Sequence, residues 1–319
     1  MITVRRFGLL LVLVGCQQEV VAPGDPRFSS ANVLSPPADP AIAFVGGGGL
    51  SVMNADGSNQ TVVVAANKTT SIGAGLPSWS PDAKHIVFGA SIAGVTGLWI
   101  VDVSVVNGTP VGGSLHKLQI TCPSGASTPG GAGPSWSPNG DVIALVAGCV
   151  QPWDGNIYVV PATGGTATVA YTSPSGFSPE WPAWSPDGSK LVFVERGDTG
   201  TTVPRALVVW DLNTSTRTEL LSFSTTFFPK TPAWSNGGGQ VAYSGVSGNS
   251  PEAVFTIAAT GGTPVQVGLG DDPTWSADDA KLAFTGTISR KSGVVTLTLT
   301  GGAVQMLAAG GAHANWRRF

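Results

Sequence analysis

One stretch decides the fold: Pro182-Ala183-Trp184-Ser185-Pro186-Asp187-Gly188-Ser189-Lys190-Leu191-Val192-Phe193. Full or partial copies of it surround five further tryptophans, Trp79, Trp136, Trp234, Trp275 and Trp316. From their positions, successive tryptophans are 57, 48, 50, 41 and 41 residues apart. A period of this size predicts a repeated supersecondary unit.

Each copy predicts a strand, a tight turn and a second strand. In Pro186-Asp187-Gly188, proline presets φ at the first turn position, Asp bonds its own backbone, and glycine takes a positive φ. The apolar run Leu191 to Val194 then predicts a strand. Third and fourth strands follow, as at Leu207 to Asp211 and Val265 to Val267. Four antiparallel strands in 41 to 57 residues make one β-propeller blade, so the sequence predicts an all-β fold.

The repeated tryptophans predict how the blades pack. A side chain of this size fills a wide gap between two neighbouring sheets. We therefore expect all six repeat tryptophans to act as wedges between blades.

The two ends of the chain predict how the ring closes. Ala41 to Val45 is typical of a second blade strand, yet no Trp-Ser-Pro turn precedes it. The missing first strand lies at the other end, around Ala314-Asn315-Trp316. Pairing them would remove open sheet edges and tie the termini together. We expect a six-bladed propeller over residues 41–319, with one blade shared by both ends.

Composition excludes one class of partner. The chain has 319 residues, 42% hydrophobic and 11% charged, with 44 glycines, which suits strands and turns. Without Arg5 and Arg6 it carries 14 basic and 19 acidic residues, a net charge of −5. No basic face is visible, so nucleic acid is not an expected partner.

The N-terminus has the pattern of a targeting segment, residues 1–15. Basic Arg5-Arg6 precedes an apolar run, Phe7 to Val14, that is too short to span a bilayer. Leu13-Val14-Gly15-Cys16 resembles a bacterial lipobox, which implies cleavage before Cys16 and lipid, including palmitate, on its sulfur and amino group. The alternative is an ordinary secretory peptide with an incidental cysteine.

Residues 16–40 predict a tether between this anchor and the propeller. Five prolines fall between Gln17 and Pro40, with little apolar periodicity. Gln17 follows the cysteine in place of the Asp that commonly retains bacterial lipoproteins in the inner membrane. We therefore expect an exported lipoprotein on the periplasmic side of the outer membrane or at the cell surface, touching the membrane only through its lipid.

The Trp-Ser-Pro-Asp-Gly turn followed by Leu-Val-Phe resembles the propeller repeat of the TolB family, over about residues 41–319. This resemblance implies that the segment folds as a β-propeller like that of the TolB family. The N-terminal α/β domain of TolB has no counterpart here, because residues 17–40 are too few to form it.

Two sets of residues are candidates for binding. Connections entering the innermost strands should supply a polar ring at the mouth of the central channel, a common place for a site: Glu180, Trp181, Lys230, Asp271, Asp272 and His313. Long loops on the same face carry unusual aromatics: Trp153, Phe177, Phe227 and Phe228. The alternatives are a solvated channel mouth and aromatics that only cover blade ends.

Catalysis has little support in the sequence. No nucleophile-elbow, phosphate-loop or zinc-protease pattern is present, and only three histidines occur, His85, His116 and His313. We expect a non-catalytic propeller without cofactor or metal that binds another envelope protein. A small molecule or glycan is a possible ligand: a glycan or peptidoglycan binder could stack sugars on Trp153 and Trp181. A channel-centred hydrolase is the third interpretation.

Two cysteines remain once Cys16 is lipidated. In an oxidising compartment we expect Cys122 and Cys149 to form a disulfide. Each follows a predicted strand, and the two strand ends should lie on the same face. The alternative is a pair of small unpaired hydrophobes.

Overall fold

The computed structural model describes residues 39–73, 75–122, 132–147, 149, 156–197, 205–223, 227–247 and 250–318. The signal segment, Cys16, most of the tether and Trp153 lie outside the described residues. Within the described part of the chain, no helix is long and apolar enough to cross a membrane.

The strands form antiparallel sheets of consecutive segments. The first holds β4 (Thr70–Ile72), β5 (Ser78–Trp79), β6 (His85–Ile92), β7 (Val95–Val106) and β8 (Thr109–Lys117). The second holds β10 (Ala132–Trp136), β11 (Val142–Ala147), β12 (Asn156–Pro161) and β14 (Thr168–Thr172). The third holds β15 (Phe177–Trp184), β16 (Lys190–Gly197), β17 (Arg205–Asp211) and β18 (Thr216–Phe223).

A seven-stranded sheet follows, made of β19 (Phe227–Trp234), β20 (Gln240–Ser247), β21 (Ala253–Ala258), β22 (Val265–Trp275), β23 (Lys281–Ile288), β24 (Lys291–Thr298) and β25 (Val304–Ala309). The last sheet has the order β26 (Ala312–Trp316), β1 (Ile42–Gly46), β2 (Gly49–Met53) and β3 (Thr61–Ala65). A short parallel pair, β9 (Ile120–Thr121) and β13 (Gly165–Thr166), links the first two sheets.

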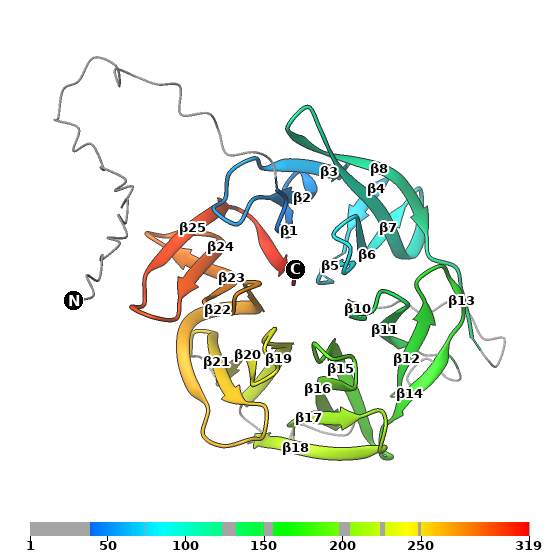
Figure 1. The fold of residues 1–319 in the computed structure, drawn as a ribbon, viewed down its shortest axis with the longest axis vertical. Helices are drawn as coiled ribbons and strands as arrows, with labels where there is room; N and C mark the ends of the chain where they lie inside the picture. The colour runs from blue at the N-terminus through cyan, green and yellow to red at the C-terminus, as the bar shows by residue number, and fades with distance from the viewer. Residues whose placement is uncertain are drawn as a thin grey trace, which may run out of the picture. The chain divides into compact units, whose positions relative to one another are not determined.

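The sheets are arranged around a common centre, a propeller-like all-β fold (Figure 1). The strands β5, β10, β15, β19, β22 and β26 lie nearest the centre in this view. Both termini contribute to the sheet of β1: Ile42 faces Trp316 and Ala43 faces Asn315 in the antiparallel β1–β26 pair. The Arg317 amide also donates to the Ala41 carbonyl at 2.8 Å. The predicted strand pairing between the two ends is therefore present.

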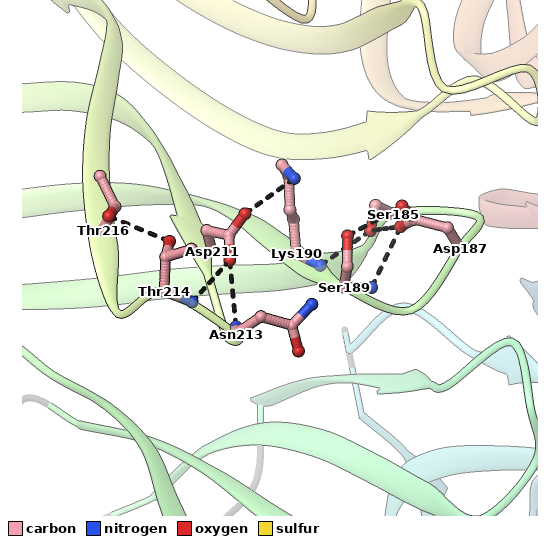
Figure 2. A network of polar contacts seen from close by, with 8 residues as sticks. All are labelled: Ser185, Asp187, Ser189, Lys190, Asp211, Asn213, Thr214 and Thr216. Carbon is pink, nitrogen blue, oxygen red and sulfur yellow. Dashed lines mark hydrogen bonds and ion pairs between the residues drawn. The ribbon is translucent and has the colours of Figure 1, made fainter.

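The inner strands β5, β10, β15, β19 and β22 each end in a hydrogen-bonded turn, shown for β15 in Figure 2. The Ser185 hydroxyl donates to Asp187 at 2.6 Å and accepts from the Lys190 amide at 2.9 Å. The Asp187 carboxylate also accepts from the Ser189 amide at 3.0 Å. Lys190 Nζ then lies 2.8 Å from Asp211 on β17. These bonds satisfy the backbone where the chain reverses.

The same turn recurs after β5, β10 and β22. The hydroxyls of Ser80 and Ser276 donate to the aspartate two residues later, at 2.5 and 2.6 Å. The glycine position takes a positive φ, 72° at Gly188. Ala83 and Asp279 occupy that position in two copies, with φ of 58° and 56°. The turn therefore keeps its geometry even where its sequence departs from Pro-Asp-Gly. We call the side of the propeller that carries these turns the turn face.

Five of the six repeat tryptophans are wedges between sheets, with 4–6% of their surface exposed. Trp184, for example, packs against Ile157 and Tyr171 of one sheet and Phe193 of the next. Trp136 is the exception, because it is only partly buried beside the core between the first two sheets. The expectation that all six act alike is thus wrong for Trp136.

A disulfide joins Cys122 and Cys149, the pairing expected from the sequence. Their Cα atoms are 5.1 Å apart, and both residues are buried in the core between the first two sheets. The bond closes a separation of 27 residues. The bond therefore links the residue that follows β9 to the chain that follows β11.

Candidate binding site at the channel mouth

The inner strands share a bulge near their starts, on the side opposite the turns. The pairing register with the next strand shifts between Glu180 and Ala183 in β15, between Lys230 and Ala233 in β19, and between Asp271 and Thr274 in β22. The residue three positions before four of the repeat tryptophans is a non-glycine residue with a positive φ: 52° at Trp181, 43° at Thr231, 55° at Asp272 and 52° at His313. Such backbone is uncommon for non-glycine residues, and bulges redirect side chains. We call the side on which these strands begin the mouth face.

Lys230 is shared by two carboxylates on the mouth face. Its Nζ lies 2.7 Å from Glu252 Oε1 and 3.6 Å from Asp271 Oδ2. The other Asp271 oxygen accepts from the Ser244 hydroxyl at 2.5 Å. Burial disfavours the Lys230 ammonium, but Glu252 and Asp271 outweigh it and raise its pKa. Burial and the Asp271 carboxylate raise the pKa of Glu252, because two acids compete for one lysine.

Asp272 and His313 join the next two inner strands. His313 Nδ1 lies 2.5 Å from Asp272 Oδ2, and the Asp272 side chain is 6% exposed. The hydrogen bond to Asp272 raises the pKa of His313 against the opposing effect of burial. The His313 amide also donates to the Thr285 hydroxyl at 3.1 Å. This contact holds β26 to β23 across neighbouring sheets.

A third group extends the polar surface along β15 to β19. Glu180 Oε1 lies 3.4 Å from Arg196 Nη2. The Arg205 guanidinium lies 4.1 Å from the centre of the Phe228 ring, a cation–π contact. Burial and the nearby Arg196 charge lower the pKa of Arg205. Phe228 is 40% exposed, so this pair offers an aromatic and a cation to solvent.

The other candidate aromatics are placed differently from Phe228. Among the described residues, Phe177, Trp181 and Phe227 lie in strands, whereas the sequence suggested loops. Phe227 stacks on Phe223 with ring centroids 5.0 Å apart and meets the Phe255 ring edge-on at 5.7 Å. Its ring therefore packs against other aromatic rings of the protein. Trp181 packs against the core between the third and fourth sheets. Phe177 is partly buried opposite Gly197.

The centre of the ring is narrow. Residues from all six inner strands line a cavity of about 90 Å³. Arg318 also lines it, and its Nη2 donates to the Trp184 carbonyl at 2.7 Å. Burial lowers the pKa of Arg318 to about 10. A cavity of this size holds a few waters, so a larger ligand would bind at the mouth rather than inside.

The structure brings together most of the predicted mouth residues, in separate pairs. Lys230 meets Asp271, and Asp272 meets His313, while Glu180 pairs with Arg196 instead. Sequence reasoning missed Arg196, Arg205, Ser244 and Glu252. None sits at a fixed offset from a repeat tryptophan, so the repeat gave no signal for them. Among the described residues, no group of three or more His, Cys, Asp or Glu side chains could hold a metal ion.

Comparison with known proteins shows the fold alone. No protein-family model matches the chain, and no curated relative matches it. TolB from Acinetobacter baumannii superposes with a TM-score of 0.63 and 16% identity, over 87% of this chain and 66% of that one. A TolB-type protein from Agrobacterium tumefaciens gives 0.59 and 17%, over 86% and 92%.

An oligogalacturonate lyase in complex with manganese gives a TM-score of 0.53 and 15% identity, over 85% of this chain and 74% of that one. Similar propellers thus include both TolB proteins and an enzyme. The chain has an all-β, propeller-like fold similar to that of the TolB-like propellers.

Proposed function

We propose that this chain is a non-catalytic, lipid-anchored envelope protein whose propeller binds another protein at the mouth face. One observation carries the proposal. Charged and aromatic groups from β15 to β26 form an arc there, with Arg205 and the 40%-exposed Phe228 at one end. Arginine and aromatic residues are enriched where protein interfaces concentrate their binding energy.

The arc suits a protein better than a small ligand. Its groups are spread over contacts between several pairs of strands, and the central cavity of about 90 Å³ is too small to enclose a substrate. Basic and acidic side chains alternate along it, which favours a partner with complementary charges. The similar TolB propellers add fold-level support only.

We infer six blades for this propeller. The seven-stranded sheet divides within β22, because Val265 to Leu269 pairs with β21 whereas Gly270 to Trp275 pairs with β23. Gly270 at the junction has φ of 153°, and a Cβ there would lie 2.2 Å from the Thr285 carbonyl oxygen. Only glycine fits so close an approach. The division yields two four-stranded blades beside the four other sheets.

The export and anchoring parts of the proposal rest on residues 1–40. Cleavage before Cys16, its lipidation and the tether to residue 40 would leave the propeller free to meet partners near the membrane. The periplasmic side of the outer membrane or the cell surface follows from Gln17.

A pull-down from crosslinked envelope membranes tests the function. The lipidated protein should retain one defined protein, and Lys230→Glu should weaken retention roughly ten-fold by placing three carboxylates together. Thr216→Ala is the matched control, because it changes an exposed side chain at the turn-face end of β18. This variant should bind as the wild type does. Equal retention by Lys230→Glu and Thr216→Ala would reject the mouth face as the binding surface.

The glycan-binding and hydrolase alternatives have weaker support at this site. Trp181, the described aromatic expected to stack on sugars, packs against the core between two sheets. Retention of polysaccharide rather than protein in the same experiment would favour the glycan alternative.

A further inference from the structure

Trp136 has left the position that the other repeat tryptophans occupy. Its Nε1 donates to the Gly140 carbonyl of its own turn at 3.0 Å. Trp184 and Trp275 instead donate to carbonyls of the preceding inner strand, at 3.1 Å each. The Trp136 ring lies nearly parallel to the His85 ring, with centroids 6.2 Å apart. Part of the Trp136 ring is thereby exposed on the turn face.

This ring lines a crevice between the first two sheets. The crevice has a volume of about 440 Å³, within the range of roughly 300–1,000 Å³ typical of small-ligand sites. Its polar lining comes from both sheets: Asp82, His85, His116, Asn139 and Asp141. It lies on the turn face, opposite the mouth face, and therefore belongs to a different site.

The polar groups of the crevice are mixed donors and acceptors. His85 Nδ1 lies 2.9 Å from Asp102, which leaves the Nε2 side of the ring toward Asp82 at 3.8 Å. Asn139 Nδ2 donates to Asp141 Oδ2 at 2.8 Å, which fixes both side chains. An amide, two imidazoles and carboxylate oxygens can both give and accept hydrogen bonds. This mixture suits a neutral ligand rich in hydroxyls, whereas a cation would require acceptors alone.

The equivalent positions of the third sheet differ from those that line the crevice. There Lys190 and Asp211 occupy the positions of His85 and Asp102 and form a closed ion pair (Figure 2). Trp234 of the next sheet, which stands to Lys190 as Trp136 stands to His85, is buried with 5% exposure. The equivalent tryptophan is therefore buried there, whereas Trp136 is partly exposed.

We propose that the crevice binds a neutral saccharide, with one sugar ring stacked on Trp136. Its hydroxyl groups hydrogen-bond to Asp82, Asn139, Asp141 and the exposed His116. The apolar face of a pyranose ring matches an aromatic plane, and its hydroxyls both donate and accept. The propeller would then hold a saccharide on its turn face and a protein on its mouth face.

Calorimetric titration of the mature protein with maltotriose, cellotriose and chitotriose tests the proposal. At least one trisaccharide should bind with a Kd of about 1 mM or lower. Trp136→Ala should raise that Kd at least about ten-fold. Asp141→Ala and His116→Ala, which change exposed side chains and should leave the melting temperature unchanged, should each raise it several-fold.

Ser189→Ala is the matched control, since Ser189 holds the position of Asp141 in the third sheet (Figure 2). It should leave the Kd unchanged. The proposal is overturned if none of the three trisaccharides binds, or if Asp141→Ala and His116→Ala bind as tightly as Ser189→Ala. Crevice-dependent binding of an oligolysine peptide in place of any trisaccharide would also overturn it, in favour of a cationic ligand.

Discussion

The turn face and the mouth face of this propeller are built by opposite means. On the turn face, Ser185 bonds residues two and five positions away, and equivalent bonds recur in other repeats. On the mouth face, Lys230 meets Asp271 and Asp272 meets His313, both pairs 41 residues apart. Short-range contacts within each repeat shape the turns, whereas two of the ion pairs on the mouth face join different repeats. We therefore expect binding where side chains of different repeats meet.

The largest expected effect comes from the disulfide, the one covalent link between repeats among the described residues. Replacing Cys122 and Cys149 together by alanine should lower the free energy of unfolding by about 2–4 kcal/mol, because the unfolded chain loses a closed loop. Urea denaturation measures the change. Wild-type protein reduced with dithiothreitol should lose a similar amount of unfolding free energy. An unchanged urea midpoint in both the variant and the reduced protein would show that the disulfide does not stabilise the fold.

Ser185→Ala should come next, since it breaks the turn of Figure 2. The buried turn loses two hydrogen bonds, and the Lys190 amide loses its acceptor, so stability should fall by about 1–3 kcal/mol. Ser189→Ala removes only a partly exposed contact and should cost under about 0.5 kcal/mol. Equal losses for the two variants would mean that the Ser185 hydroxyl is not the centre of the turn.

The His313–Asp272 pair should make the mouth face sensitive to pH. Because the folded-state pKa of His313 is raised, its stabilisation is complete below the ordinary histidine value and is lost as pH rises through the raised pKa. The loss should be about 1 kcal/mol, the difference between a charged and a neutral hydrogen bond. Free energies of unfolding measured from pH 5 to 9 give the size of this loss. In His313→Gln the free energy of unfolding should depend less on pH. If the pH dependence of that variant is as steep as in the wild type, the His313–Asp272 pair is not its source.

The smallest effect concerns the glycine position of the turns. Ala83→Gly should stabilise the fold by up to about 1 kcal/mol by relieving a left-handed alanine, while Gly188→Ala should cost about as much. The two melting temperatures should move in opposite directions. A shift in the same direction would show that the turns are not equivalent.

Sequence reasoning could predict what the repeat determines. The turns, the strand order, the β1–β26 pairing and the tryptophan wedges all follow from residues at fixed spacing. The partial burial of Trp136 escaped prediction: its ring stacks on His85 of another repeat, and spacing along the chain does not reveal that contact. Phe227 escaped for a similar reason, since Phe223 and Phe255 enclose it only in the folded chain.

The mouth face could be predicted only in part. Glu180, Lys230 and Asp271 share one offset from a tryptophan, so their common side was visible in the sequence. Arg196, Arg205 and Glu252 sit at strand ends with no such offset, and their contacts arise from the meeting of neighbouring strands.

Site-specific photo-crosslinking tests the central claim most directly. A photoreactive amino acid at position 228, beside Arg205 on the mouth face, should crosslink one envelope protein in intact cells. The same group at position 216, on the turn face, should not. A crosslink from position 216 and none from position 228 would contradict the assignment of protein binding to the mouth face.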